Sequence, residues 1–488
     1  MSLLKNAAWG FSGELVVRVT KIVQVLVLVR WLGAEQYGRF NHALSVASLF
    51  GIFFDLGIAT VAVREFAKNP RDQGVLLEYG ALKVVSSAVG LTLLSGWAWL
   101  TFHNGGENRL ILLMGFFLWL ADFGSYVFVV YRGRQEFWKE TAVRAVTSAL
   151  QLAACILALV MRGDVTTVVA ALAVSAGLGL VPLGLEVRRI KIIKMVSFGQ
   201  LWTPLRECLP MTCTAIVTAV YMNYDIVVLA KHVSMDEIGW YSVAVKTVFG
   251  IFIMPIYFFS LASLPALSVQ ASAAEAAAAR ARWLGNFART TLVGALLALG
   301  IAVFAKPLIW LAFGRTFAPA TPVLVAFTLP CFFFYIYTPL AQWVLIQRRQ
   351  TWSMAISIGS ALLNVALVTW WVPIGGIWGA TLAAVVTHAA LALGHLRIVL
   401  CHADFDGTER DWWAIVRSVV ALGAAWLIVE WWQRSAFLAG AAAVAVFCVI
   451  ARPQVRRLAA DLASMARRAW ARWGPSSAGR PQPDRPLS

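Results

Sequence analysis

Three ionisable residues near the start of the chain have a spacing that could do chemistry. Glu14, Arg18 and Lys21 lie four and three residues apart, so on a helix they share one face. They interrupt an apolar run, and such a stripe must face a water-filled cavity or a partner rather than lipid. Two cations there could bind an anion, with Glu14 holding Arg18 in place when no ligand is bound. The alternative is a structural ion pair near the helix end, with Lys21 paired elsewhere.

Ionisable residues also lie well inside other apolar runs. Lys246 is too far from the ends of its run to reach water easily, so we expect it to face a cavity or to pair with Asp225 or another helix. Asp225 could bind a cation or a proton, or it could anchor Lys231. Asp122 lies near the middle of its run, where a lone carboxylate needs a partner or a proton. It is therefore a candidate site for a coupling ion.

Three more charged residues lie near the ends of their runs. Asp55 precedes a Leu-Gly pair, and we expect it to cap a helix or to pair with Arg64. Lys83 and Arg144 lie within a turn or two of helix ends, where a long side chain can snorkel to water. If they face inward instead, they form a basic vestibule at the cytoplasmic side.

The elements that position these residues are membrane helices. The chain has 488 residues, of which 60% are hydrophobic and only 13% are charged, whereas a soluble protein carries about 25% charged residues. Apolar runs of about 20 residues match the thickness of the hydrocarbon core of a bilayer. The net charge of +17 does not indicate nucleic-acid binding, because the basic residues lie between the apolar runs or in the tail. The composition therefore predicts an all-α polytopic membrane protein.

We predict about fourteen transmembrane helices. They lie near residues 9–31, 39–62, 78–101, 109–130, 141–161, 165–185, 203–231, 239–264, 284–305, 319–345, 351–373, 375–399, 413–432 and 435–451. Sixteen Lys and Arg residues fall in one set of connections and seven in the alternate set. The positive-inside rule therefore predicts that both termini are cytoplasmic. The basic amphipathic segments 186–194 and 455–473 are expected on the cytoplasmic membrane surface.

A short internal repeat indicates how the helices are arranged. Residues 28–41 (LVRWLGAEQYGRFN) match residues 229–242 (LAKHVSMDEIGWYS) at an offset of 201. Six spans separate the copies, so both have the same orientation, which is a parallel repeat about an axis along the membrane normal. The predicted organisation is an N-terminal six-helix lobe (1–190), a C-terminal six-helix lobe (191–400), two extra helices (401–452) and a basic cytoplasmic tail (453–488).

An ordered set of motifs over residues 1–400 resembles a known family. They read WLGAEQYGRF, FFDLGIATVAVREFAK, NYDIVVLAKHVSMDEIGWYSVAVK, FGRTFAPATPVL and LLNVALVTWWVPIGGIWGATLA. They are similar to the polysaccharide-biosynthesis flippases for O-antigen or exopolysaccharide, of the multidrug/oligosaccharidyl-lipid/polysaccharide exporter superfamily. The resemblance implies two six-helix lobes in the bacterial inner membrane. It also implies export of undecaprenyl-pyrophosphate-linked oligosaccharide to the periplasmic leaflet by alternating access. The alternatives are a drug or amphiphile exporter, or a lipid II flippase.

With such a substrate, the intramembrane polar residues acquire expected roles. Arg18, Lys21 and Lys246 would be cavity cations for the pyrophosphate, and Lys83 and Arg144 would form its vestibule. Glu14, Asp55, Asp122 and Asp225 would support these cations or couple an ion. Gln342, Asn364 and His388 lie in mid-span, where interhelical hydrogen bonding is the default and sugar contact is the alternative.

An enzyme acting on lipid-linked sugars is not expected. The sequence has no phosphate-cradling glycine loop, no metal-binding cluster and no Ser/His/Asp arrangement, so we expect no cofactor and no metal. The external connections are all short, whereas such an enzyme needs catalytic groups outside the membrane. The expected partners are the lipid-linked oligosaccharide, membrane lipids, a polysaccharide polymerase and a chain-length regulator, and not nucleic acid. An ion gradient or substrate turnover would drive transport.

Overall fold

The computed structural model is almost entirely helical in the part of the chain that it describes, and that part contains no strand. That part comprises residues 3–101, 105–188, 198–253, 255–256, 273–402, 413, 415–423 and 436–473. Within it, nine helices or continuous helical stretches are long and apolar enough to cross a membrane. Two of these stretches have 57 and 52 residues, enough for two crossings each. The fold is therefore that of a multi-pass membrane protein, and the total of fourteen spans stays a prediction.

Two glycines divide the longest helices, α1 (Leu3–Asp55) and α15 (Gln350–His402). Gly33 has a φ of 73° and Gly376 a φ of 52°, which glycine adopts readily because it lacks a Cβ atom. We expected loops between residues 31 and 39 and between 373 and 375. The structure has a break at both places, in the form of a sharp kink: two helices meet at Gly33, and two helices meet at Gly376.

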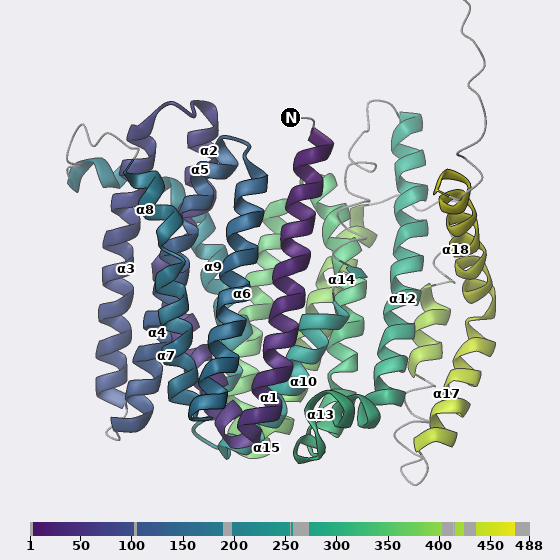
Figure 1. Cartoon of the computed structure of the whole chain (residues 1–488). Helices are drawn as coiled ribbons and strands as arrows, with labels where there is room; N and C mark the ends of the chain where they lie inside the picture. Colours follow the sequence, from purple (N-terminus) through teal and green to yellow (C-terminus); the bar gives the residue numbers. More distant parts are fainter. Residues whose placement is uncertain are drawn as a thin grey trace, which may run out of the picture. The chain divides into compact units, whose positions relative to one another are not determined.

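The remaining helices follow the predicted runs closely (Figure 1). They are α2 (Ile58–Lys68), α3 (Gln73–Thr101), α4 (Gly105–Ser125), α5 (Val127–Gly133), α6 (Phe137–Met161), α7 (Val165–Leu178), α8 (Val181–Val187), α9 (Trp202–Leu229), α10 (Met235–Thr247), α12 (Ala273–Phe313), α13 (Ala320–Ala326), α14 (Thr328–Ile346), α17 (Ala436–Ile450) and α18 (Arg452–Trp473). Short 3₁₀ turns, η1 (Phe198–Leu201) and η3 (Arg315–Phe317), and the π-helical turn η2 (Val248–Phe252) join them. Half of the predicted span 413–432, and residues 189–194 of the predicted basic segment, lie outside the described residues.

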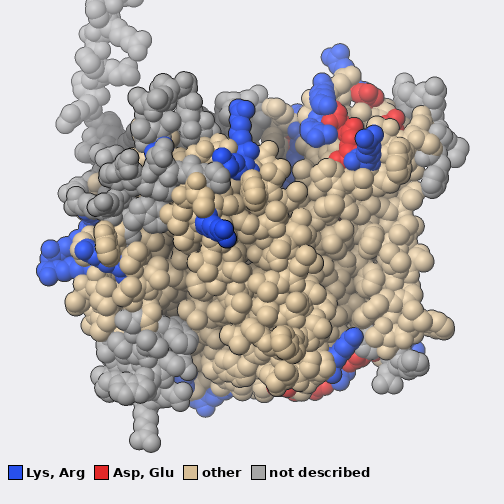
Figure 2. All heavy atoms as spheres, turned by 180° about the vertical axis from the view of Figure 1, so that it is seen from behind, with Lys and Arg blue, Asp and Glu red and all other residues tan. Residues whose placement is uncertain are grey.

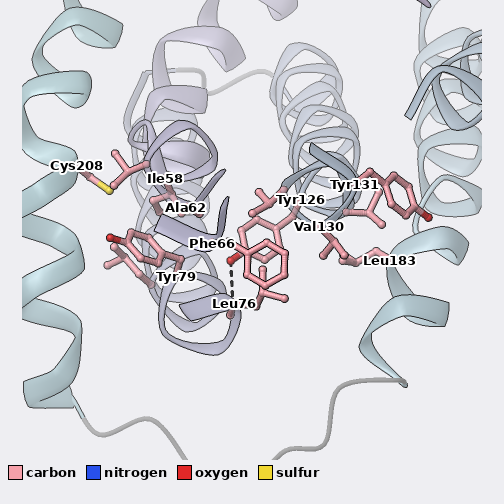
Figure 3. Close-up of a cluster of buried hydrophobic side chains, with 14 of the residues drawn as sticks. Ile58, Ala62, Phe66, Leu76, Tyr79, Tyr126, Val130, Tyr131, Leu183 and Cys208 are labelled. Carbon is pink, nitrogen blue, oxygen red and sulfur yellow. Dashed lines mark hydrogen bonds between the residues drawn. The ribbon is translucent and has the colours of Figure 1, made fainter. Parts of the chain in front are cut away.

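The chain packs as two compact units. The first unit comprises Met1–Phe252, Ala305–Pro330 and Met354–Leu391, and the second comprises Ile253–Phe304, Cys331–Ser353 and Ala392–Ser488. Part of the core of the first unit lies between α2, α3, α5, α8 and α9 (Figure 3). There the Tyr126 hydroxyl donates a hydrogen bond to the backbone oxygen of Leu76 at 3.0 Å. In the second unit, Trp283 stacks on Trp343, with ring centroids 4.8 Å apart.

Within the first unit, α1 and α10 cross at a pair of glycines. A Cβ atom on Gly38 would lie 1.8 Å from the backbone oxygen of Met235, and one on Gly239 would lie 2.2 Å from that of Ala34. The contacts are equivalent under the repeat offset, which carries Ala34 to Met235 and Gly38 to Gly239. Such reciprocity is what a two-fold axis through the crossing produces. It supports the repeat at this point, while superposition of two whole lobes stays a prediction.

Candidate functional site

A chain of alternating charges joins α1 to α6, two helices that pack side by side in the first unit (Figure 1). Arg18 Nε donates to Glu14 Oε1 at 2.8 Å, and Glu14 Oε2 lies 3.5 Å from Arg144 Nη1. Arg144 Nε lies 2.9 Å from Glu140 Oε1. Arg132 binds both oxygens of Glu140, at 2.7 and 2.8 Å. We call these five residues the charge ladder.

The charge ladder has surplus positive charge and access to solvent. It holds three arginines against two glutamates, and the side chains of Arg18 and Glu14 are 35% and 47% exposed. Lys21 is exposed one turn further along α1, and no acceptor bonds it among the described residues. The predicted group Glu14, Arg18 and Lys21 is therefore extended by Arg144 on the neighbouring helix. An anion can reach these cations without opening the core.

A second charged group, the lysine cluster of Lys83, Asp55 and Asp122, joins α3, the end of α1 and α4. Lys83 Nζ lies 3.0 Å from Asp55 Oδ1 and 2.6 Å from Asp122 Oδ2. Its side chain is only 1% exposed, so the expectation that Lys83 snorkels to water was wrong. With two carboxylates on one ammonium, the cluster has no cation to offer a phosphate. The ion pair with Lys83 stabilises the carboxylate of Asp122 in the middle of its helix.

Asp55 caps a helix, which was one of the two predicted alternatives, and it also binds Lys83. Its Oδ1 accepts a hydrogen bond from the backbone nitrogen of Ala59 at 3.1 Å, so it caps the start of α2. The predicted pairing with Arg64 is not formed. Arg64 instead binds Glu65 at 2.8 Å and Glu207 at 3.3 Å.

Lys246 is held at the crossing of α1 and α10. Its Nζ donates to Asn41 Oδ1, and it lies over the ring of Tyr37, 5.7 Å from the centroid. No carboxylate among the described residues pairs with it, so the suggested pair with Asp225 is not formed. The π-helical turn η2 begins two residues later, and such turns are frequent at functional sites.

Asp225 lies where α9 packs against α10. Tyr241 donates its hydroxyl to Asp225 Oδ2 at 2.5 Å, and the backbone nitrogen of Ile226 donates to Oδ1 at 2.8 Å. Among the residues that the structure describes, Asp225 has no cationic partner, and Lys231 is exposed rather than anchored to it. A carboxylate left without a cation at membrane depth is a candidate proton or cation site.

The three mid-span polar residues have different surroundings. His388 of α15 forms a hydrogen bond with Tyr221 of α9, whose hydroxyl oxygen lies 2.9 Å from Nε2 of His388. Its other ring nitrogen, Nδ1, lies 2.7 Å from the backbone oxygen of Ala384. Asn364 Nδ2 donates to Thr387 Oγ1 at 3.4 Å across the kink of α15. Gln342 belongs to the second unit and is half-buried there.

Sequence reasoning missed several partners of the predicted residues. Glu140 precedes Arg144 by four residues, so helical spacing could have found that pair. Asn41 and Tyr241 both lie in or beside the repeated segments, but nothing in the pattern indicated which residue each would contact. Groups of three or more His, Cys, Asp and Glu side chains placed to hold a metal ion are absent from the described part of the chain.

The molecular surface agrees with a membrane location. In Figure 2, charged side chains gather in small groups that are separated by broad surface carrying neither Lys and Arg nor Asp and Glu. Exposed apolar side chains are correspondingly numerous, including Trp99, Leu311 and Ile374 at 78%, 78% and 79% exposure. Such exposure in water would promote aggregation, whereas in a bilayer it is the expected outer surface.

Comparison with known proteins identifies the family. A family model described as polysaccharide biosynthesis protein matches residues 3–271. The chain belongs to this family. A protein of Shigella flexneri named "Putative O-antigen transporter" is 29% identical over 114 residues, which are 22% of this chain and 26% of that protein. The aligned part thus spans about a quarter of that relative.

Solved structures show the same fold. The inward-closed lipid II flippase MurJ has a TM-score of 0.67 and 13% identity, with 91% of this chain and 98% of that chain covered. An inward-facing multidrug resistance transporter of the MATE family has a TM-score of 0.58 and 13% identity, with 79% and 98% covered. Both structures are named for transport, one as a flippase and one as a multidrug transporter. This chain is therefore a multi-pass membrane protein of the polysaccharide biosynthesis family that shares their fold.

Proposed function

We propose that this chain is a flippase for lipid-linked oligosaccharides. It moves undecaprenyl-pyrophosphate-linked repeat units from the cytoplasmic to the periplasmic leaflet of the bacterial inner membrane, and both its termini are cytoplasmic. The observation that carries the proposal is the solvent-accessible charge ladder, with Lys21 beside it. Family membership and the O-antigen relative supply the substrate class.

The proposed mechanism begins with an exchange of partners at Arg18. The pyrophosphate displaces Glu14 from Arg18 and also binds Lys21, because charge-assisted bonds to phosphate are short and strong. Arg144, which lies 3.5 Å from Glu14, retains that carboxylate when Arg18 lets it go. Moving a pyrophosphate away from bulk water is tolerable only beside fixed cations. The sugars travel with the headgroup, while the undecaprenyl tail stays in lipid.

The lysine cluster and Asp225 are the proposed supporting groups. Asp225 is the better candidate for the coupling ion, because Tyr241 donates to it and no described cation neutralises it. The lysine cluster holds its own counter-charge, so it supports the packing of α1, α3 and α4. Lys246 contributes a further cation deep in the first unit. The proposed partners of the chain are a polysaccharide polymerase and a chain-length regulator.

A lipid II flippase is the second candidate. It is favoured by the likeness to MurJ over 91% of this chain. Lipid II and O-antigen precursors share the undecaprenyl pyrophosphate, so the charge ladder fits either. A drug exporter would have less use for paired cations at the entrance of its site.

The test is complementation of two bacterial strains, one lacking its O-antigen flippase and one depleted of its lipid II flippase. The chain should restore surface polymer in the first and not growth in the second. Arg18→Ala/Lys21→Ala should lower polymer by at least about tenfold, since each lost charged hydrogen bond to phosphate is worth that much. Arg71→Ala, an exposed arginine outside the ladder, is the matched control.

Membrane abundance is measured by quantitative immunoblotting of every variant. Normal polymer from the double variant at normal abundance would overturn the site. Loss of the double variant from the membrane would instead assign the ladder a structural role. Rescue of the lipid II strain alone would replace the O-antigen substrate by lipid II.

A further inference from the structure

The helical segment 415–423 in the second unit has two distinct faces. Ile415, Ser418 and Leu422 are buried at 6%, 0% and 3% exposure, and Leu422 belongs to the same core as Phe447 of α17. Trp413, Val416 and Val420 lie on the opposite face and are 61%, 45% and 55% exposed. Together with Arg417 and with Ile450 at the end of α17, these three line a groove of about 370 Å³.

The groove combines apolar walls with unpaired positive charge. Arg417 lies in it, and α18 begins at Arg452, two residues after Ile450. Arg456 and Arg457 follow in the first turns of α18. None of these four arginines has a carboxylate partner among the side chains that the structure describes. The charge is not needed for internal pairing, because Val455 and Leu458 already pack α18 onto the core.

An anionic lipid uses both features. A soluble anion would bind the arginines but would not contact the three apolar side chains. A neutral lipid would contact the apolar side chains but would not bind the arginines. We propose that the groove binds one anionic phospholipid. Its acyl chain lies over Trp413, Val416 and Val420, and its phosphate is bound by Arg417 together with the arginines that open α18.

The predicted topology agrees with this ligand. In that topology, the span that includes residues 415–423 starts at the cytoplasmic side, and α17 returns to that side at Ile450. The cytoplasmic leaflet carries the anionic headgroups that attract juxtamembrane basic residues. A bound phospholipid would also fix the start of α18, an amphipathic basic helix, at the membrane surface. The site differs from the charge ladder, which lies in the other unit.

The test uses the full chain in phosphatidylcholine nanodiscs that contain a trace of phosphatidylglycerol with a diazirine on its acyl chain. After illumination, mass spectrometry should find the label on peptides containing residues 413–423 or 444–450. Arg417→Gln should lower the labelling about fivefold, the worth of one basic residue at an anionic headgroup. Val420→Trp, which fills the groove without changing charge, should lower it as well. Arg71→Gln should leave it unchanged.

Three outcomes would overturn the proposal. One is equal labelling by a phosphatidylcholine probe of the same design. Another is unchanged labelling in both Arg417→Gln and Val420→Trp. The third is competition by undecaprenyl phosphate at lower concentration than by unlabelled phosphatidylglycerol, which would make the occupant a polyprenyl lipid. No transport is needed, so the result is independent of the flippase proposal.

Discussion

Two groups in the first unit each pair basic with acidic side chains, but in different surroundings. In the lysine cluster, Lys83 is 1% exposed and the carboxylates of Asp55 and Asp122 are 30% and 29% exposed. In the charge ladder, Arg18 and Glu14 are 35% and 47% exposed. Lys83 is buried against two carboxylates, so it cannot readily exchange a partner for a ligand. Arg18 can, because solvent stabilises both members of its pair during the exchange.

The difference between the groups is one of desolvation. Removing one member of a buried ion pair leaves an uncompensated charge and is strongly destabilising. Breaking an exposed pair changes stability little, because water replaces the lost partner. Burial therefore separates the ion pairs that stabilise this fold from those that can exchange a partner for a ligand. The sequence pattern alone does not distinguish the two groups, because both combine basic with acidic residues.

Replacement of Lys83 should have the largest effect on stability. Lys83→Met leaves Asp55 and Asp122 facing each other without a counter-ion, so the free energy of unfolding should fall by about 3 kcal/mol. Adding Asp122→Asn should recover part of that loss, because one of the two charges is then removed. Thermal unfolding of purified protein in detergent measures both. If Arg18→Met destabilises the protein as much as Lys83→Met, the distinction between the two groups fails.

Glu14→Gln should have a smaller effect, and on transport rather than on stability. The change removes the carboxylate between Arg18 and Arg144, and the free energy of unfolding should change by about 1 kcal/mol or less. Polymer export should fall less than in Arg18→Ala/Lys21→Ala, because both cations that bind pyrophosphate remain. Export is measured in the O-antigen strain, with Arg71→Ala as control. A deeper loss than in the double variant would mean that Glu14 itself contacts the ligand.

Replacement of Asp164 should have a small effect on stability, with the clearest dependence on pH, and none on polymer export. Its side chain caps α7, accepting from the backbone nitrogen of Thr167 at 3.2 Å and from the Thr167 hydroxyl. The hydrogen bond from the Thr167 hydroxyl is the main reason why the pKa of Asp164 lies below its usual value. Asp164→Ala should therefore lower the free energy of unfolding at pH 7 by about 1 kcal/mol.

The sign of the pH effect follows from the lowered pKa of Asp164 in the folded state. The stabilisation is fully present above the ordinary aspartate pKa of about 3.9, and it is lost as pH falls through the lower folded value. Wild type and Asp164→Ala should thus differ at pH 7 and converge in acid. Thermal unfolding of both proteins across that range measures the difference. A gap that persists in acid would show that the cap does not depend on the charge.

Local features of this protein could be predicted from the sequence. The apolar runs and the low charge determine a multi-pass membrane protein, and most helices begin and end near the predicted residues. The pair Glu14 and Arg18 was also predictable, because residues four apart on a helix face each other whatever the rest of the chain does. The Leu-Gly break at Gly33 was also predicted, and the structure has a kink between two helices there.

Which helix faces meet was decided by the tertiary structure alone. Lys83 finds its carboxylates 28 and 39 residues away, and Lys246 finds Asn41 at a separation of 205. The same holds for Tyr221 and His388, which are 167 residues apart. Helical periodicity determines which residues share a face, but the partner of that face depends on how whole helices pack. The mistaken pairing of Asp55 with Arg64 has this cause: the nearer arginine binds Glu65 and Glu207, and α3 brings Lys83 to Asp55 instead.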